Sequence, residues 1–235
     1  MKINIIGRGN VATHLNKAFS GSNTVELINP HTLENLDYTS DIILICVSDD
    51  AIEGIIRKLN VCDSIIAHTS GSVSIDLFKD KFKNYGVFYP LQTFTKNVEL
   101  NYSEIPVFIE GSSEDVSKKL IDLGSTFANK IVFANSASRR KLHLASVFAC
   151  NFTNALARIA DNILSDTNIP FENILPLMHQ TVNKLNFLSP EEAQTGPAVR
   201  GDKKVMEAHL NLLKDAPELA ELYKLFSGII MGNKK

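Results

Sequence analysis

The chain has 235 residues, enough for one large domain or two modest ones with a sizeable core. Hydrophobic residues make up 44% and charged residues 21%, and the formal net charge is −2, so neither nucleic acid nor an anionic membrane is expected as a partner. No apolar run reaches the roughly 18 residues of a membrane span, and three cysteines without metal-like spacing favour reduced thiols, no bound metal and a cytoplasmic location.

The first part of the chain alternates short apolar segments with helical patterns. The segments are short, rich in Ile and Val and bounded by turn residues, which predicts buried strands at residues 2–6, 24–28, 42–47, 64–68, 85–89 and 106–110. Helices are expected between them at residues 11–19, 51–59, 75–82 and 114–128, and Asp50 and Ser74 stand where N-caps belong. This alternation predicts right-handed crossovers and a doubly wound, mainly parallel Rossmann sheet.

From about residue 136 the pattern is helical only. Long helices are expected at residues 138–165 and 171–188, followed by a loop at residues 189–201 and two more helices at residues 202–213 and 217–230. We therefore predict an α/β nucleotide-binding domain over residues 1–135 and an all-helical domain for substrate and dimerisation over residues 136–235.

A glycine-rich turn follows the first predicted strand directly. It reads Gly7-Arg8-Gly9-Asn10-Val11-Ala12. At a junction of strand and helix, Gly7 permits a tight turn, Gly9 lets the backbone approach a pyrophosphate, and Ala12 allows close packing of the helix on the sheet. The turn is interpreted as a dinucleotide site to which all of residues 7–11 contribute, the alternative being a glycine turn with a structural role only.

The end of the second predicted strand carries no acid. About twenty residues after the glycine turn, NAD-binding domains have an Asp or Glu that binds the ribose diol. Here Asn29 stands at that point, followed by Pro30 and His31. NADP is therefore favoured over NAD, because no carboxylate would repel a 2′-phosphate. The arginine expected for NADP is also missing there, so His31 or Arg8 would have to bind the phosphate.

The glycine turn resembles the fingerprint G-x-G-N-[MV]-A of pyrroline-5-carboxylate reductase and of deazaflavin-dependent NADP oxidoreductases. Residues 43–52 resemble a strand motif of the same superfamily whose backbone passes under the cofactor, which implies that Val47 and Ser48 contact it. Nearly the whole chain resembles a bacterial family of Rossmann-like oxidoreductases whose C-terminal domain has no assigned function. The segments that carry this resemblance are residues 68–72, 89–94, 143–152 and 194–200. That family usually has Ser-Arg at the tip of the second strand, and this chain departs from it there.

Ligands of doubly wound sheets bind beyond the carboxyl ends of the strands. Two segments of this chain leave the sheet on that side. In the first, Ser70 and Gly71 are suited to bring hydroxyl and N–H groups to a substrate or nicotinamide, or they form only a strand end and a helix cap. In the second, Gln92 is a neutral donor after Pro90 and a candidate for substrate binding. Prephenate dehydrogenase has a similar strand-end segment near its substrate.

The first long helix has two faces of different chemistry. One is apolar and consists of Leu144, Phe148, Phe152, Ala155, Ile159 and Ile163. The opposite stripe has neither acid nor lysine and consists of His143, Val147, Cys150, Asn151 and Asn154. Uncharged hydrogen-bonding residues favour the wall of a polar cleft between the domains over a solvated surface or a subunit contact.

His143 is the first candidate for a general acid, because hydride delivery to a carbonyl or imine needs a proton and histidine titrates closest to neutrality. Asn151 and Asn154 are candidates to orient the substrate, as helix asparagines do in ketopantoate reductase. Lys184, at the border of the apolar arc of the second helix, is the rival acid, or else a surface lysine. Arg200 is a candidate to clamp a carboxylate or phosphate, or part of a plain connector.

These features predict an NADP-dependent reductase or dehydrogenase acting on a small polar carbonyl, hydroxyl or imine. The alternatives are a non-catalytic dinucleotide-binding redox sensor or assembly subunit, and a helical interaction module that binds no dinucleotide. A homodimer through the helical domain is expected as well, because about 100 residues of helix cannot cover this much apolar surface alone. Two apolar faces motivate this expectation, Leu175, Met178, Val182 and Leu185 on one helix and Leu219, Leu222, Leu225 and Phe226 on another.

Overall fold

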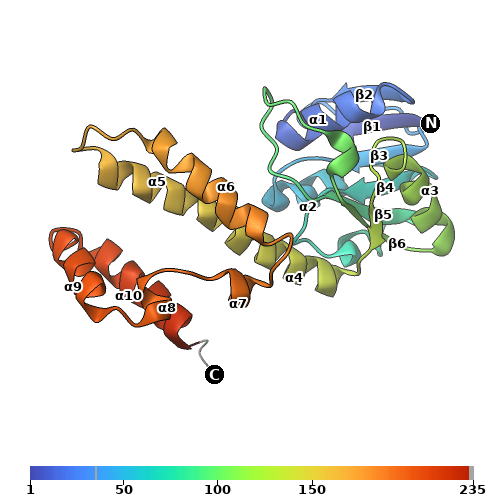
Figure 1. Cartoon of the computed structure of the whole chain (residues 1–235). Coiled ribbons are helices and arrows are strands. Elements are labelled where there is room, and N and C mark those ends of the chain that lie inside the picture. The colour runs from blue at the N-terminus through green and yellow to red at the C-terminus, as the bar shows by residue number, and fades with distance from the viewer. Residues whose placement is uncertain (35, 233–235) are drawn as a thin grey trace. The chain divides into compact units, whose positions relative to one another are not determined.

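The computed structural model describes residues 1–34 and 36–232, and the chain divides into two compact units, Met1–Ala155 and Leu156–Lys235 (Figure 1). The first unit is built on a sheet and the second is helical. The sequence places the domain boundary near residue 136, at the start of the long helix, whereas the compact units divide within that helix.

The first unit contains a seven-stranded, mostly parallel sheet. Its strands are β1 (Lys2–Ile6), β2 (Thr24–Ile28), β3 (Ile42–Ile45), β4 (Ile65–His68), β5 (Tyr85–Pro90), β6 (Val107–Gly111) and β7 (Ile131–Phe133). They are ordered β2-β1-β3-β4-β5-β6-β7, and only the pair β5–β6 is antiparallel, with Phe88 opposite Ile109. This confirms the predicted fold class. Strand β7 is not among the predicted strands; it has only three residues, and the third, Phe133, is exposed.

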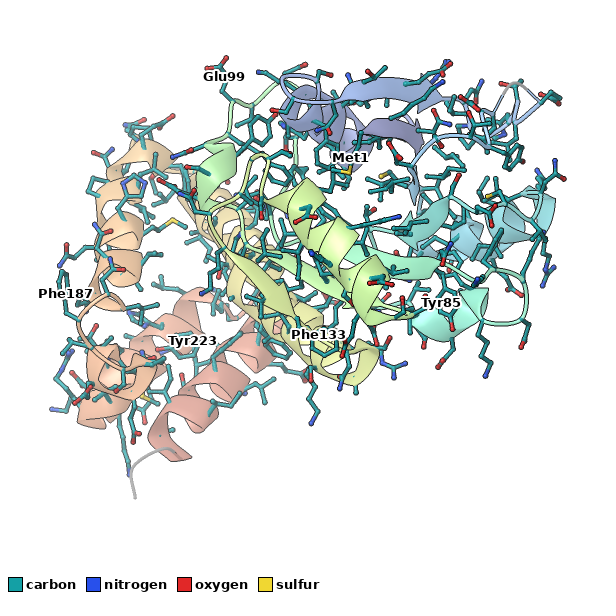
Figure 2. All side chains as sticks on the ribbon, turned by 90° about the vertical axis from the view of Figure 1, so that its right-hand side faces the viewer. Met1, Tyr85, Glu99, Phe133, Phe187 and Tyr223 are labelled. Atoms are coloured by element: carbon teal, nitrogen blue, oxygen red, sulfur yellow. The ribbon has the colours of Figure 1, made fainter. Side chains whose placement is uncertain are left out.

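Both faces of the sheet are covered by helices, because side chains alternate between the faces along each strand. Helices α1 (Asn10–Phe19) and α3 (Glu114–Gly124) pack on one face through residues such as Leu15 and Leu120. Helix α2 (Asp49–Lys58) and the 3-10 turn η1 (Ile75–Phe78) pack on the other through residues such as Ile52. Figure 2 shows the side chains that fill the space between the sheet and its helices.

Some predicted helix ends differ from the observed ones. Helix α2 begins at Asp49 with Ser48 at the N-cap position, so the prediction that Asp50 caps it is wrong. Both acids lie in the first turn, where the positive end of the helix dipole stabilises them. Ser74 caps η1 as predicted, by accepting from the N–H of Asp76, but η1 ends at Phe78 and the predicted helix over residues 75–82 is too long.

The long helix predicted over residues 138–165 consists of three parts. Helix α4 (Ser136–Ser146) is followed by a π-helical segment, η3 (Val147–Phe152), and then by α5 (Thr153–Leu164), in which the first unit ends. A π-helical segment has hydrogen bonds between residues five apart, so it changes which side chains share a face of the helix.

The second unit begins within α5, at Leu156, and continues with further helices. They are η4 (Phe171–Asn173), α6 (Leu175–Lys184), α7 (Pro190–Ala193), α8 (Pro197–Arg200), α9 (Lys203–Leu212) and α10 (Pro217–Gly232). The predicted loop over residues 189–201 therefore contains two single-turn helices, each begun by a proline, which suits the first helical position. Asp202 caps α9 by accepting from the N–H of Val205. Among the residues described, no helix is both long and apolar enough to cross a bilayer.

Candidate functional site

The turn between β1 and α1 is shaped by two glycines with different tasks. Gly7 has a φ of +145°, a conformation that favours glycine, and a Cβ there would overlap the carbonyl oxygen of Cys46. Its N–H donates to the carbonyl of Ile28 at 3.0 Å, which ties the turn to the end of β2. Gly9 is the N-cap of α1, and a Cβ there would meet nothing within 4 Å. The space beside Gly9 is therefore open.

The N-terminus of α1 is left without an internal partner. The first N–H bonded within the helix is that of Thr13, which donates to the carbonyl of Gly9 at 3.0 Å, so those of Asn10, Val11 and Ala12 have no helical acceptor. No side chain caps this end, and no acid lies in the first turn. Free N–H groups and a positive dipole end bind anions, so this end of the helix fits the diphosphate of a dinucleotide.

A hollow of about 410 Å³ lies over this helix start, at the carboxyl ends of β1, β3 and β4. Its lining consists of Gly7, Arg8, Gly9, Asn10, Val11, Pro30, Cys46, Val47, Ser48 and Thr69. Seven of the predicted cofactor residues, residues 7–11, 47 and 48, are thus brought together, and Arg8 is the only charged residue in the lining.

The tip of β2 forms a tight turn at the border of the hollow. Pro30 belongs to the lining, whereas Asn29 and His31 on either side of it do not. The side-chain oxygen of Asn29 accepts from the N–H of His31 at 3.1 Å, which fixes the turn. No acid stands at this point, where the sequence is Asn29-Pro30-His31.

The polar turn after β4 links this hollow to a second group of residues. Thr69 lines the hollow, and the buried hydroxyl of Ser70 accepts from the N–H groups of Ser72 and Val73, both at 3.1 Å. The hydroxyl of Ser72 donates to Asp49 at the start of α2. Ser70 therefore holds the shape of the turn, and its hydroxyl is already engaged.

Gly71 in the same turn packs against Tyr89 and His143. A Cβ at Gly71 would lie 2.7 Å from Cζ of Tyr89 and 2.8 Å from Nδ1 of His143, so a larger residue there would displace one of the two side chains. The hydroxyl of Tyr89, at the carboxyl end of β5, is 3.0 Å from Nδ1 of His143 on α4. Burial raises the pKa of Tyr89, and the carboxylate of Asp49 raises it further. The tyrosine therefore remains protonated at neutral pH.

This pair of side chains borders a cavity of about 580 Å³ within the first unit. The cavity is lined by Tyr89, Leu91, Gln92, Thr93, Phe94, His143, Ser146, Val147, Ala149, Cys150 and Asn151. Three predicted site residues, Gln92, His143 and Asn151, thus lie around one cavity, and Asn154, an exposed residue of α5, is not part of its lining. The lining contains no Asp, Glu, Lys or Arg.

Helix α4 is attached to the sheet by a buried arginine one turn before His143. The guanidinium of Arg139 is fully buried and donates to the carboxylate of Glu110 on β6 and to the carbonyl of Val73. The hydroxyl of Ser136 donates to the same carboxylate at 2.7 Å. In the sequence, Arg139 belongs to a short basic run and gives no sign of this role. The network fixes the part of α4 that carries His143.

His68, at the end of β4, is fully buried, whereas His143 is half-buried. The Nδ1 of His68 accepts from the N–H of Ser70 at 3.2 Å, its ring stacks on Phe78, and its Nε2 has no partner among the residues described. Burial and, to a smaller extent, the charge of Arg139 lower the pKa of His68 to about 4. His68 is therefore neutral, and it belongs to the interior rather than to the cavity lining.

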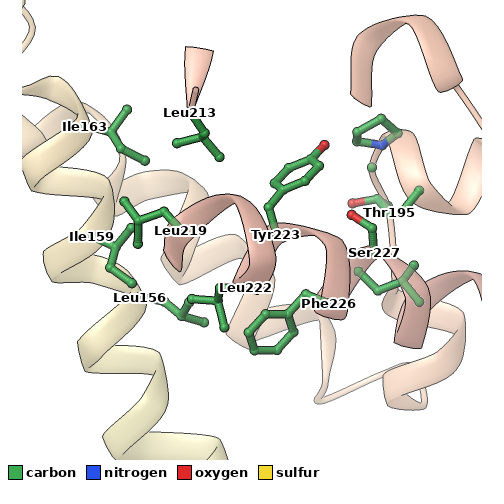
Figure 3. Close-up of a pocket in the computed structure, with 14 residues that line it drawn as sticks. Leu156, Ile159, Ile163, Thr195, Leu213, Leu219, Leu222, Tyr223, Phe226 and Ser227 are labelled. Atoms are coloured by element: carbon green, nitrogen blue, oxygen red, sulfur yellow. The ribbon is translucent and has the colours of Figure 1, made fainter. Parts of the chain in front are cut away.

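The remaining predicted site residues, Lys184 and Arg200, belong to the second unit. The ammonium group of Lys184 donates to the carbonyl of Ala193 at 3.2 Å, and Arg200 is exposed at the end of α8. This unit has a pocket of its own, of about 360 Å³, between α5, α8 and α10 (Figure 3). Its lining is apolar apart from Thr195, Ser227 and Tyr223, whose hydroxyl is bound to His209 at 2.9 Å. The pocket is therefore mainly apolar, in contrast to the cavity beside His143.

The chain is similar to a protein-family model and to several proteins of known structure. A family model described as a domain of unknown function (DUF2520) matches residues 105–230. A "putative NADP oxidoreductase" from Bacteroides fragilis is 35% identical and similar over 99% of this chain and 98% of its own, with a TM-score of 0.90. The search of curated proteins found no match.

Two enzymes of known reaction share the fold at low identity. They are an imine reductase from Myxococcus stipitatus in complex with NADP⁺ (16% identity, 98% of this chain and 93% of that one, TM-score 0.63) and 1-pyrroline-5-carboxylate reductase from Streptococcus pyogenes (14%, 99% and 98%, TM-score 0.60). These comparisons confirm the predicted resemblance to Rossmann-like NADP oxidoreductases with a helical C-terminal domain.

Proposed function

The chain belongs to the DUF2520 family, and from this premise we propose that it is an NADP-dependent reductase or dehydrogenase that transfers hydride to or from a small polar carbonyl, hydroxyl or imine. One observation carries the proposal: the turn after β4 borders both the hollow and the cavity. Thr69 lines the hollow, and two residues later Gly71 packs against Tyr89 and His143. A dinucleotide site and a proton donor thus lie on the two sides of one short turn.

The residues around the hollow fit a dinucleotide. The N–H groups of Asn10, Val11 and Ala12 would bind its diphosphate, and Arg8 is the cation available for a 2′-phosphate. Bound NADPH would supply the hydride. The absence of an acid at the tip of β2 supports NADP, with NAD as the alternative.

His143 is the proposed proton donor, and Tyr89 positions it. Because Nδ1 of His143 is bound to the tyrosine hydroxyl, Nε2 is the ring atom left for the substrate. The protonated imidazole donates from Nδ1 to the oxygen of Tyr89 and gives its Nε2 proton to the developing oxyanion or amine, which leaves a neutral ring that carries its proton on Nδ1. The imidazole is then reprotonated from solvent. In the oxidation direction, Nε2 accepts the proton of a substrate hydroxyl.

The cavity lining also narrows the class of substrate. Gln92 and Asn151 provide neutral hydrogen-bonding groups, whereas the lining has no Asp, Glu, Lys or Arg, and His143 gives up its proton in the reaction. Burying a carboxylate without a partner is costly. We therefore propose that the part of the substrate held in this cavity is uncharged.

The test is turnover of NADPH, followed by its absorbance, with matched pairs of substrates. Each pair consists of a keto acid and its uncharged methyl ester, and cyclic imines are included as well. We expect turnover with uncharged compounds and a higher kcat/KM for each ester than for its acid. Binding of NADPH without turnover of any compound would instead support a non-catalytic dinucleotide-binding protein.

Cofactor binding is tested separately with variants of Gly9. The backbone φ of Gly9 is −78° and the space beside it is open, so Gly9→Ala should leave both the fold and NADPH binding nearly unchanged. Gly9→Asp adds a carboxylate where the diphosphate would lie, and we expect calorimetry to detect no binding while thermal unfolding stays like that of wild type. Undiminished NADPH affinity in Gly9→Asp would show that the cofactor assignment is wrong.

A further inference from the structure

We propose that His14 is a positioning residue that couples nucleotide binding to the order of the loop over the cavity. This inference rests on the proposed function, because it takes the N-terminus of α1 as the nucleotide site. Helix α1 presents Asn10 and Val11 to the hollow, and one turn later it carries His14, whose ring reaches the loop after β5. One helix therefore contacts both parts of the site.

The loop in question, residues 91–101, contains no helix or strand. Four of its residues, Leu91, Gln92, Thr93 and Phe94, form part of the cavity wall. Most of the loop is exposed, and a single backbone hydrogen bond closes within it, from the N–H of Val98 to the carbonyl of Thr95 at 3.0 Å. Segments with so few internal contacts open at low free-energy cost, so the order of this wall depends on what anchors the loop.

His14 is that anchor, and it is 3% exposed. Its Nε2 is 2.9 Å from the carbonyl oxygen of Thr95, and its Nδ1 is 3.0 Å from the hydroxyl of Tyr102 just after the loop. Its ring also lies against that of Phe94, with centroids 5.2 Å apart. One side chain thus holds both the middle and the end of the loop.

The chemistry of these contacts selects a histidine. A carbonyl oxygen only accepts, so Nε2 must carry a proton toward Thr95, and in the neutral ring Nδ1 then accepts from Tyr102. A glutamine side chain can donate to the carbonyl oxygen of Thr95. It lacks the rigid ring that allows Nδ1 of His14 to accept from Tyr102 at the same time. Helix α1 and the loop are also joined by the pair Lys17–Glu99, whose charges are exposed and 4.0 Å apart, and such pairs contribute little.

Coupling follows from this arrangement. A dinucleotide that binds the N-terminus of α1 holds the helix in place, and the helix holds the loop through His14. If binding orders the loop, then by linkage an ordered loop strengthens binding by the same factor. Loss of the His14 contacts should therefore remove the coupling between nucleotide binding and the order of the loop.

The loop offers a direct readout, because trypsin cleaves after the exposed Lys96 in its turn. We expect NADPH to slow cleavage at Lys96 by about fivefold or more in the wild-type chain, a typical coupling. His14→Leu should raise the cleavage rate without NADPH and abolish the protection. Tyr102→Phe, which removes only a hydroxyl, should reduce the protection, and His14→Gln should restore part of what His14→Leu loses. Lys17→Ala is the matched control on the same helix and should behave like wild type.

The outcomes separate the two proposals. If NADPH binds by calorimetry but protects Lys96 equally in wild type, His14→Leu and Tyr102→Phe, the coupling proposal is wrong and the proposed function stands. If wild type binds no NADPH, the proposed function fails and the coupling fails with it. If His14→Leu does not fold, Tyr102→Phe decides the question, since full protection in that variant contradicts the role of the histidine.

Discussion

The two compact units bury apolar side chains to very different degrees. In the first, residues such as Ile5, Leu44 and Phe88 are completely buried on the two faces of the sheet. In the second, only Ala198 and Ser227 are buried among the residues described, whereas Phe187 is 86% and Leu212 83% exposed. The first unit has a core of its own. The second leaves apolar surface that another surface must cover.

The difference in burial suggests that the first unit binds and reacts, whereas the second unit serves assembly. Both the hollow and the cavity lie in the first unit, where Tyr89 stands at a strand end and His143 on a helix tied to the sheet, and rigid elements hold reacting groups in place. The second unit has an apolar pocket and apolar helix faces. We therefore expect changes in the first unit to alter binding and rate, and changes in the second to alter assembly.

The largest expected effect concerns His143. Loss of a general acid lowers turnover by about 10²–10⁴, so His143→Ala should reduce kcat to this extent while NADPH affinity stays unchanged. Activity of the wild type in the direction of reduction should fall as pH rises, because the proton donor then loses its proton. The matched variant is Lys184→Ala in the second unit, which should retain activity. Full activity in His143→Ala together with loss in Lys184→Ala would make the lysine the acid.

Assembly is the next test, because the second unit should be covered by a second copy of the chain. We expect light scattering to give twice the chain mass of 26.0 kDa at micromolar concentration. Leu225, on α10, is 62% exposed, so Leu225→Asp costs little in a monomer but places a charge in a dimer interface. The dimer should then dissociate, with Kd raised by about 30-fold or more. Val61→Asp, at a 71% exposed position of the first unit, should leave it intact. A wild-type monomer would contradict the prediction.

Much of the sheet could be predicted because its signals are local. Strands β1 and β2 begin and end at the predicted residues, and the central strands, buried on both faces, read as continuous apolar runs. Strand β7 could not be found in this way, since it has three residues and Phe133 is 67% exposed. Helices α7 and α8 have only four residues each and depend on proline starts rather than on periodicity.

The site was predictable where it depends on neighbours in sequence. The hollow follows from the glycine turn, because that turn and the helix start shape it together. The pair of Tyr89 and His143 could not be predicted, since the two residues are 54 apart and meet only through the packing of α4 on the sheet. A regular period also placed Asn154 on the same stripe as His143, whereas the π-helical segment between them breaks that period.

A smaller effect, on the pH dependence of stability, is expected from the buried His68 of the first unit. The pKa of His68 is lowered to about 4 by burial and by Arg139, against 6.5 in the unfolded chain. Between these values the unfolded state binds more protons, so stability is present above pH 6.5 and is lost as pH falls toward 4. We expect His68 to account for about 2 kcal/mol of the unfolding free energy lost between roughly pH 7 and pH 5.

Urea unfolding at the two pH values measures this loss. In His68→Gln the part of the pH dependence due to this group should disappear, even if the variant is less stable at both values. The exposed His179 of the second unit provides the control, since His179→Gln should leave the pH dependence unchanged. An unchanged pH dependence in His68→Gln would show that the histidine is not held neutral by the fold.

The smallest effect we expect is the preference for NADPH over NADH, and it again depends on the first unit alone. Arg8 is the only charged residue lining the hollow, and one charge-assisted contact contributes about 1.5–3 kcal/mol. Because Arg8 is exposed, its contact with a 2′-phosphate should be at the low end, so NADPH should bind about tenfold more tightly in paired calorimetric titrations. Arg8→Ala should bring the ratio close to one. Asn29→Asp keeps an oxygen acceptor for the N–H of His31, and thus the turn, but adds the ribose-binding acid, so it should shift the ratio toward NADH. A clear preference for NADH in the wild type would show that NAD is the cofactor, although the tip of β2 carries no acid to bind its ribose.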